Sequence, residues 1–297
     1  MSNKLRKMTL EKKHNLTGWA FLAPATFLIA VFSFWPMIKA LVLSFQTGKG
    51  RNMQMAGFTN YIRMFQDDVF IQSIKNTFFY FILQVPFMLV VALVLACILN
   101  KKDLRFKGFF RTMIFVPCTT SLVAYSIIFR SLFANNGLVN YVLVNIGILD
   151  KPYNFLTQPF AAKMVILLGL LWRWTGYNMV FFLSGLQNIE YSVYEAAKID
   201  GASAIQTFFK ITVPLLKPTI LLTAIMSTNG TLQLFDESVN LTDGGPANAS
   251  ISMSHYIYNL CFKYVPNFGY AAAMSFFILL LVAVLAFIQM RVGDKRD

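Results

Sequence analysis

Six apolar segments, each long enough to cross a membrane as a helix, constrain this chain more than any other feature of its sequence. A helix needs about 20 mostly apolar residues to span the hydrocarbon core of a bilayer. Lipid-exposed backbone must also satisfy its own hydrogen bonds, which favours helices. The segments cover residues 19–38, 76–99, 112–129, 164–186, 218–235 and 268–290. The sequence therefore predicts an all-α fold, a polytopic transmembrane helix bundle with six spans.

The composition agrees with a membrane protein. Of the 297 residues, 57% are hydrophobic and 13% are charged, whereas soluble domains carry about 25% charged residues. The first apolar segment follows a basic N-terminus, as a secretory signal does. It exceeds the apolar length expected of a signal sequence, and no small-residue cleavage site follows it, so we expect a retained helix.

The distribution of basic residues predicts the orientation. Sixteen of the 26 Lys and Arg residues fall on one side of the six predicted spans, nine fall on the other, and Arg173 lies within a span. The richer side is expected to be cytoplasmic. Both termini and the loop at 190–214 then face the cytoplasm, which gives an N-in, C-in arrangement.

Several function classes find no support in the sequence. The net charge of +13 is divided among loops between apolar runs, so it does not form the basic face of a nucleic-acid-binding protein. There is no GxxxxGK[ST], HExxH or GxSxG motif. The three cysteines and two histidines have no metal-ligand spacing. We expect no catalytic residues, no metal site and no cofactor bound by this chain.

Polar residues inside the spans indicate a solute path, because polar groups at membrane depth usually face a bundle interior or a water-filled route. They gather in the fourth span and at the outer end of the fifth. Aromatic faces beside amide and hydroxyl groups suit sugars, which have apolar C–H faces and a rim of hydroxyls. The candidate path residues are Trp172, Arg173, Trp174, Tyr177, Asn178, Ser227, Asn229, Thr231 and Gln233.

An alternative explanation of these residues is a network of hydrogen bonds between helices, with Arg173 neutralised by Asp236 or Glu237. The two acids are also expected at the outer interface, as solvated charges. The pair Asn229-Gly230 predicts a bend in the fifth span, since glycine weakens a helix interior by about 1 kcal/mol.

A regular pattern occupies the predicted cytoplasmic loop at 190–214. It reads Glu-Ala-Ala, three residues, glycine, nine residues and Ile-x-Val-Pro, from Glu195 to Pro214. The alanines are small enough for another surface to approach closely. Gly201 permits a sharp turn between two short helices, and Pro214 suits the first turn of the next helix. Taken alone, the pattern also fits an interfacial hairpin that packs under its own bundle.

This pattern resembles the EAA loop of ABC-importer permeases, where the usual ending has leucine in place of Val213. Further stretches resemble the carbohydrate-uptake branch of that family, which includes the maltose, glycerol-phosphate and lactose permeases. These stretches are GLQNI, YEAAKIDGAS, the Trp-rich fourth span, FDESVNLTDGGPANAS and FGYAAAMS, and the resemblance covers most of residues 105–290.

The resemblance implies a coupling helix that docks in a cleft of a separate ATPase. That role falls on Glu195, Ala196, Ala197, Asp200, Gly201 and Ala202. It also implies two ATPase subunits that hold ATP and magnesium, a second, non-identical permease subunit, and an extracytoplasmic substrate-binding protein. Contact with the binding protein falls on Asp243, Gly244, Gly245 and Pro246.

We therefore interpret the chain as one permease subunit of an ATP-driven, binding-protein-dependent importer in the cytoplasmic membrane of a prokaryote, moving a sugar or oligosaccharide by alternating access. Residues 1–17 form a basic cytoplasmic segment, and 18–297 form one permease domain with its core at 70–290. The alternatives are an ion-coupled secondary carrier, an ABC permease for a non-sugar solute, and a structural membrane protein. The chain lacks the evident inverted repeat that many secondary carriers show.

Overall fold

The computed structural model describes residues 10–49, 52–101 and 103–293. Seven of the basic residues that enter the orientation prediction lie outside this part of the chain: Lys4, Arg6, Lys7, Arg51, Lys102, Lys295 and Arg296. In chain order the elements are α1 (Leu10–Ile29), η1 (Ala30–Phe34), α2 (Trp35–Ser44), β1 (Gln46–Lys49), β2 (Asn52–Met55), α3 (Thr59–Met64), α4 (Asp68–Asn100), α5 (Lys107–Thr119), α6 (Leu122–Leu132), α7 (Leu138–Asn145), α8 (Pro159–Gln187), α9 (Tyr191–Ile199), α10 (Ala204–Thr207), η2 (Phe208–Thr212), α11 (Val213–Leu215), α12 (Lys217–Leu232), η3 (Ser238–Thr242), α13 (Met253–Tyr258), η4 (Asn259–Lys263) and α14 (Phe268–Gly293).

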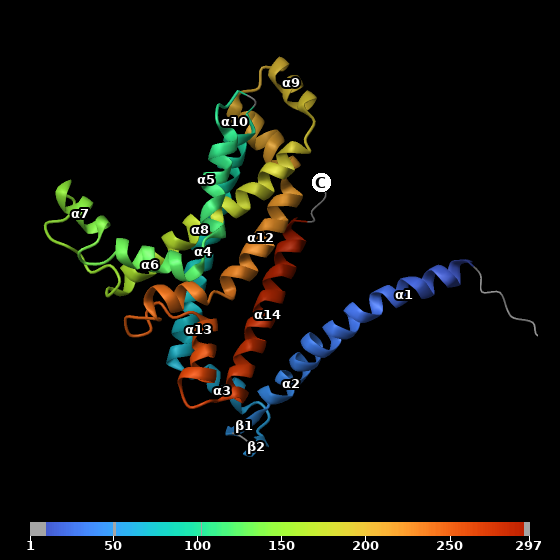
Figure 1. The fold of residues 1–297 in the computed structure, drawn as a ribbon, viewed down its shortest axis with the longest axis vertical. Coiled ribbons are helices and arrows are strands. Elements are labelled where there is room, and N and C mark those ends of the chain that lie inside the picture. The colour runs from blue at the N-terminus through green and yellow to red at the C-terminus, as the bar shows by residue number, and fades with distance from the viewer. Residues whose placement is uncertain (1–9, 50–51, 102, 294–297) are drawn as a thin grey trace, which may run out of the picture.

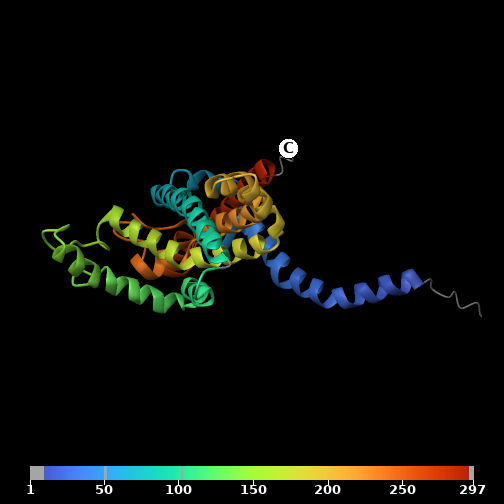
Figure 2. The same ribbon diagram turned by 90° about the horizontal axis from the view of Figure 1, so that it is seen from above.

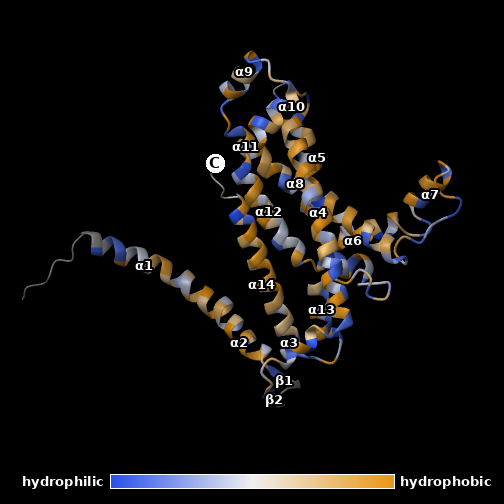
Figure 3. Cartoon of the chain, turned by 180° about the vertical axis from the view of Figure 1, so that it is seen from behind, coloured by the Kyte–Doolittle hydropathy of each residue, from blue (hydrophilic) through white to orange (hydrophobic). Residues whose placement is uncertain are grey.

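Long helices dominate the fold, as predicted (Figure 1). Four of them are long and apolar enough to cross a membrane: 14–44, α4, α8 and α14. Figure 3 shows the hydrophobic residues along their lengths. The short helices α9 and α10 lie at one end of the bundle, and the β1–β2 hairpin and α3 lie at the opposite end.

The other two predicted spans are bent. The helices α5 and α6 meet at 97°, and the segment 204–215 meets α12 at 70°, so there are four straight candidate spans, or up to six if each bent pair counts as one. The first bend follows the end of α5, where Thr120 donates its hydroxyl to the carbonyl of Pro117 at 2.7 Å. The second bend, at Leu216, lies between Pro214 and Pro218.

The bend predicted at Asn229-Gly230 is wrong, because α12 continues through both residues and ends at Leu232. Glycine lowers helix stability by about 1 kcal/mol but leaves the N–H and carbonyl groups of the helix in place, whereas proline removes a donor and crowds the preceding turn. The prolines that flank Leu216 therefore mark the break more strongly than Gly230 does.

Two features of the N-terminal third extend beyond the prediction. A two-stranded antiparallel hairpin, with Gln46 opposite Met55, adds β-structure to a chain predicted as all-α. The helix α1 projects away from the other helices (Figures 1 and 2), whereas α2 contacts α14. None of the best apolar window of residues 14–44 is buried within the chain.

Three apolar clusters form the interior. One joins the start of α4 to α13 and α14 around Phe70 and Tyr270. A second joins the end of α4 to the end of α8 around Phe182 and Leu216. The third packs α6 and α8 against the segment that follows α12, around Tyr125. The helix α4 contributes to all three clusters and is therefore the central element of the fold.

Candidate coupling surface and solute path

The loop at 190–214 forms two short helices, α9 and α10, that meet at Gly201. The helix α9 ends where Gly201 adopts a φ of 75°, a left-handed conformation that glycine adopts without steric cost. The N–H of Ala202 then bonds the carbonyl of Ala197 at 2.9 Å, the closing bond of a common helix C-terminus. The next helix begins with a capping box between Ser203 and Gln206.

The predicted coupling residues differ in exposure. Glu195, Ala196, Asp200 and Gly201 are exposed, Ala202 is half-buried, and Ala197 is buried against its own chain. Only the exposed residues can contact a partner directly. Gly201 has no heavy atom within 4 Å of the position that a Cβ would take, so the turn is open on its outer side.

Two apolar side chains on this surface were missed from the sequence. Ile199 is 86% exposed at the end of α9, and Ile205 is 72% exposed in α10, so they lie on either side of the Gly201 turn. Isolated apolar residues that interrupt a polar loop were the signal available. We call the six residues Glu195, Ala196, Ile199, Asp200, Gly201 and Ile205 the turn surface.

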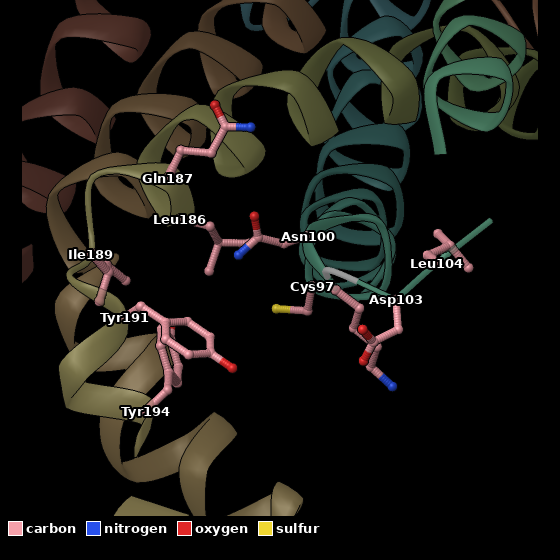
Figure 4. A pocket seen from close by; sticks show the side chains of 10 residues that line it. Cys97, Asn100, Asp103, Leu104, Leu186, Gln187, Ile189, Tyr191 and Tyr194 are labelled. Carbon is pink, nitrogen blue, oxygen red and sulfur yellow. The ribbon is translucent and has the colours of Figure 1, made fainter. Parts of the chain in front are cut away.

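A cavity of about 660 Å³ opens beside α9 (Figure 4). Cys97, Asn100 and Asp103 line it from the end of α4 and the following loop, and Tyr191 and Tyr194 line it from α9. The helix α9 therefore has open space on the side that faces α4, while Tyr194 approaches the hydroxyl of Thr212 at 3.4 Å on the chain that leads to α12.

In the fourth predicted span, now α8, the aromatic cluster is largely engaged in packing. Trp172 is 43% exposed and stacks on Tyr125 with ring centroids 6.1 Å apart. Trp174 meets Tyr177 edge-on at 5.8 Å. Arg173 is 7% exposed, and its guanidinium lies 5.5 Å from the Tyr125 ring and 5.4 Å from the Trp174 ring.

Part of the predicted path is a hydrogen-bond network between helices. The hydroxyl of Ser227 donates to Asn178 at 3.3 Å. Thr231 donates to Gln84 of α4 at 2.9 Å, in a buried contact. Gln84 was missed from the sequence, although a single amide within the apolar run of 76–99 was a signal for it. These residues join α4, α8 and α12.

The remaining path residues of α12 lie on a different face. Asn229 and Gln233 are exposed, one helical turn apart, and their side-chain amides are hydrogen-bonded to each other. They line a groove of about 570 Å³ together with Ser254 of α13 and Ser275 of α14. The structure thus divides the predicted path into a buried network and an open, polar-lined groove.

The outer loop that contains Asp243 is folded into a compact turn. Gly244 is buried, Gly245 and Pro246 are half-buried, and the Asp243 side chain is 65% exposed and lies 2.6 Å from Lys263. The amide of Asn76 in α4 donates to the carbonyls of residues 248 and 251, at 3.2 and 2.9 Å. The loop is therefore fixed to the central helix.

His255, next to this loop, is fully buried. Its Nδ1 lies 2.9 Å from the hydroxyl of Ser238, and its Nε2 lies 3.6 Å from the Asp243 carboxylate. Burial lowers the pKa of His255 to about 4, although the charge of Asp243 acts in the opposite direction. The imidazole is therefore neutral near pH 7.

The prediction that Asp236 and Glu237 are solvated charges is wrong for Glu237, whose exposed fraction is only 4%. Asp236 is half-buried. The apolar neighbours Leu234 and Leu241 pack into the cluster around Tyr125 and carry the intervening residues inward with them. In the sequence, an acidic pair at the end of an apolar segment indicates the membrane–water interface, because the packing of Leu234 and Leu241 cannot be read from the sequence.

Among the described residues, no group of three or more His, Cys, Asp or Glu side chains could hold a metal ion. The candidate functional surfaces are the turn surface, the groove beside α12 and the outer loop.

Comparison with known families decides between the function classes. Residues 67–296 match the family model described as the inner membrane component of binding-protein-dependent transport systems. The chain belongs to this permease family. It is a multi-pass membrane protein of a prokaryote and a transport component rather than an enzyme, with ATP hydrolysis carried by a separate chain.

Individual permeases and structures are similar over nearly the whole chain. The lactose transport system permease protein LacF of Rhizobium radiobacter is 50% identical over 292 residues, covering 98% of each chain. The multiple sugar-binding transport system permease protein MsmF of Streptococcus mutans is 33% identical, covering 97% of this chain and 99% of its own length. A bacterial alginate ABC transporter, solved with a periplasmic protein bound to an alginate pentasaccharide, contains a chain that matches with a TM-score of 0.84 and 25% identity, covering 96% of each.

Proposed function

We propose that this permease is one transmembrane subunit of an ATP-driven importer for a disaccharide or short oligosaccharide, with lactose as the first candidate. The observation that carries the proposal is the 50% identity to a lactose permease across 98% of both chains. Other relatives are named for arabinooligosaccharides and for multiple sugars, which supports the carbohydrate class.

The importer is proposed to contain a second, non-identical permease, two ATPase subunits and an extracytoplasmic binding protein, all assembled at the cytoplasmic membrane. A binding-protein partner is supported by the family description. The proposal of ATPase partners rests on the resemblance of the 195–214 pattern to an EAA loop, and the proposal of a second, non-identical permease rests on the resemblance of the Gly244-Gly245-Pro246 loop to that of the family.

The turn surface is proposed to dock in a cleft of the ATPase. Ile199 and Ile205 offer apolar contacts, and Glu195 and Asp200 offer charges at the edge, which matches an interface with an apolar centre and a polar rim. Closure of the ATPases on ATP would then displace α9, and the cavity beside α4 gives this helix room to move.

The solute path is proposed to run along the exposed side of α12, where Asn229 and Gln233 present amides, and past Tyr177 of α8. The buried contacts of Ser227 and Thr231 hold α12 against α8 and α4. In this proposal, those two residues preserve the relative positions of the helices during alternating access, and Asp243 faces the binding protein.

The experiment that tests the proposal is reconstitution of the complex, assembled from co-purified partner subunits, in lipid nanodiscs. ATP hydrolysis is measured with unloaded binding protein and with binding protein loaded with lactose, another disaccharide or an amino acid. Loaded binding protein with a sugar should stimulate hydrolysis by about 5-fold or more, a typical size for coupling between sites. Stimulation by the amino acid but by no sugar would contradict the substrate class, and the absence of any ATPase partner would contradict the mechanism.

A further inference from the structure

Arg173 carries a buried positive charge that its surroundings leave without a direct partner. Its Nε and Nη1 are buried and have no hydrogen-bond partner among the described residues. An arginine cannot release its proton in a protein, and a buried charge is costly unless another charge balances it. The two aromatic rings beside the guanidinium, Tyr125 and Trp174, offset part of this cost by cation–π contact.

Glu237 is a buried carboxylate in the same part of the interior. It is 4% exposed and lies between Leu234 and Leu241, both of which pack in the cluster that contains Tyr125 and Trp174. The segment that carries Glu237 is therefore packed in the same apolar cluster as the two rings that border Arg173. Burial raises the pKa of Glu237, whereas its own backbone amide and the charge of Arg173 lower it.

The position of Glu237 gives this pair a mechanical consequence. Glu237 lies immediately before η3, and η3 leads directly into the turn that carries Asp243. Arg173 lies in the middle of α8, within the cluster predicted to border the solute path. A link between the two would connect the outer loop to α8 through the interior of the protein.

We propose that Glu237 is a positioning residue whose buried carboxylate balances the charge of Arg173 across the cluster and fastens the outer loop to α8, so that displacement of the loop moves this helix. The role of the loop as a docking site rests on the proposed function, whereas the charge pair itself does not. Asp236, the other acid considered from the sequence, is half-buried and lies outside the pair.

The first arm of the test concerns the pair alone. The variants R173Q, E237Q, R173Q/E237Q and the control D236N are prepared as the assembled complex in nanodiscs, and thermal melting is followed without ATP or sugar. Because loss of one partner leaves an uncompensated buried charge while loss of both does not, each single variant should melt lower by roughly 6 °C or more. The double variant should recover most of that loss, and D236N should melt within about 2 °C of wild type.

The proposed interaction between Arg173 and Glu237 would be overturned if the decreases in melting temperature of the single variants add up in the double variant. It would also be overturned if D236N lowers the melting temperature as much as E237Q does. If a single variant fails to assemble, recovery of assembled complex in R173Q/E237Q supports the pair, and continued failure overturns it.

The second arm of the test asks whether the two residues transmit displacement of the outer loop to α8. In the double variant, the stimulation of ATP hydrolysis by loaded binding protein, measured relative to that variant's own unstimulated rate, should fall by about 5-fold or more. The charge-swapped variant R173E/E237R should regain part of that stimulation. Full stimulation in the double variant would overturn the role in transmission. Failure of the proposed function is a different result, since wild-type complex would then respond to no loaded binding protein while the melting pattern stands.

Discussion

Replacement of Gly176 by alanine tests the contact between α5 and α8 that positions the aromatic cluster of the path. A Cβ at Gly176 would lie 1.9 Å from the carbonyl oxygen of Ile114, 2.8 Å from its carbonyl carbon and 3.1 Å from the Cα of Phe115. All three atoms belong to the backbone of α5, so no change of side-chain rotamer can relieve the clash. To restore an ordinary contact of 3.4 Å, α5 would have to move away from α8 by about 1.5 Å.

The magnitude follows from two opposing effects. Overpacking of a tight interior typically costs 1–3 kcal/mol, whereas the change from glycine to alanine in a helix interior returns about 1 kcal/mol. Because this neighbour is backbone, we take the upper part of the range and expect a net loss of about 2 kcal/mol of stability. For a chain of this size, that corresponds to a melting midpoint lower by on the order of 5 °C.

Gly230→Ala is the matched control. Gly230 also lies within a helix, α12, but no heavy atom lies within 4 Å of the position of its added Cβ. Its midpoint should stay the same or rise. Both variants are purified in the same detergent, and melting is followed by loss of the monodisperse peak in size-exclusion chromatography. Equal midpoints for the two variants, or a larger loss for Gly230→Ala, would refute the assignment of close α5–α8 packing at Gly176.

The other predictions concern coupling, pH and the path. Gly201→Trp should abolish the stimulation of ATP hydrolysis by the binding protein while the complex still assembles. Gly201→Ala should cost only about 1–2 kcal/mol of local backbone strain. Intact stimulation in the tryptophan variant would contradict the coupling role of Gly201. Stability should fall as the pH drops from about 6.5 to 4, because His255 becomes protonated in the unfolded chain over this range but, with a pKa near 4, stays neutral in the folded chain. The variant His255→Gln should flatten this part of the pH–stability profile. An unchanged slope in that variant would contradict the buried neutral imidazole. Thr231→Val should lower stability by about 1–3 kcal/mol, since Gln84 loses its buried hydrogen-bond donor. Gln233→Ala should alter sugar selectivity in uptake assays and leave the melting midpoint unchanged. The reverse pattern would show that the roles of the buried network and the open groove have been exchanged.

The four straight candidate spans could be predicted because lipid imposes a simple length and composition rule on each segment. The two short helices around Gly201 were equally accessible, since the capping residue Ser203 and the glycine act over a few positions. The break between α5 and α6 could not be predicted from the sequence in this way. It depends on Thr119 and Thr120 bonding the carbonyls of the preceding turn, and threonines of this kind also occur inside unbroken membrane helices.

Long-range contacts explain the rest of the difference between sequence and structure. The candidate path residues were identified by type, but their division into a buried network and an open groove depends on Gln84, which lies 147 positions from its partner Thr231. The burial of Glu237 depends on Leu234 and Leu241 packing against α6 and α8. A sequence pattern gives the face of a helix, whereas these outcomes require knowledge of which helix covers that face.

The most direct test of the central claim is sugar accumulation in sealed proteoliposomes that contain the complete complex. With ATP inside the vesicles, loaded binding protein outside and no ion gradient, radiolabelled lactose or a related oligosaccharide should accumulate above its external concentration. Omission of ATP or of the binding protein should abolish this accumulation. Accumulation driven by a sodium or proton gradient in vesicles that contain this chain but no ATPase would contradict the account and identify an ion-coupled carrier instead.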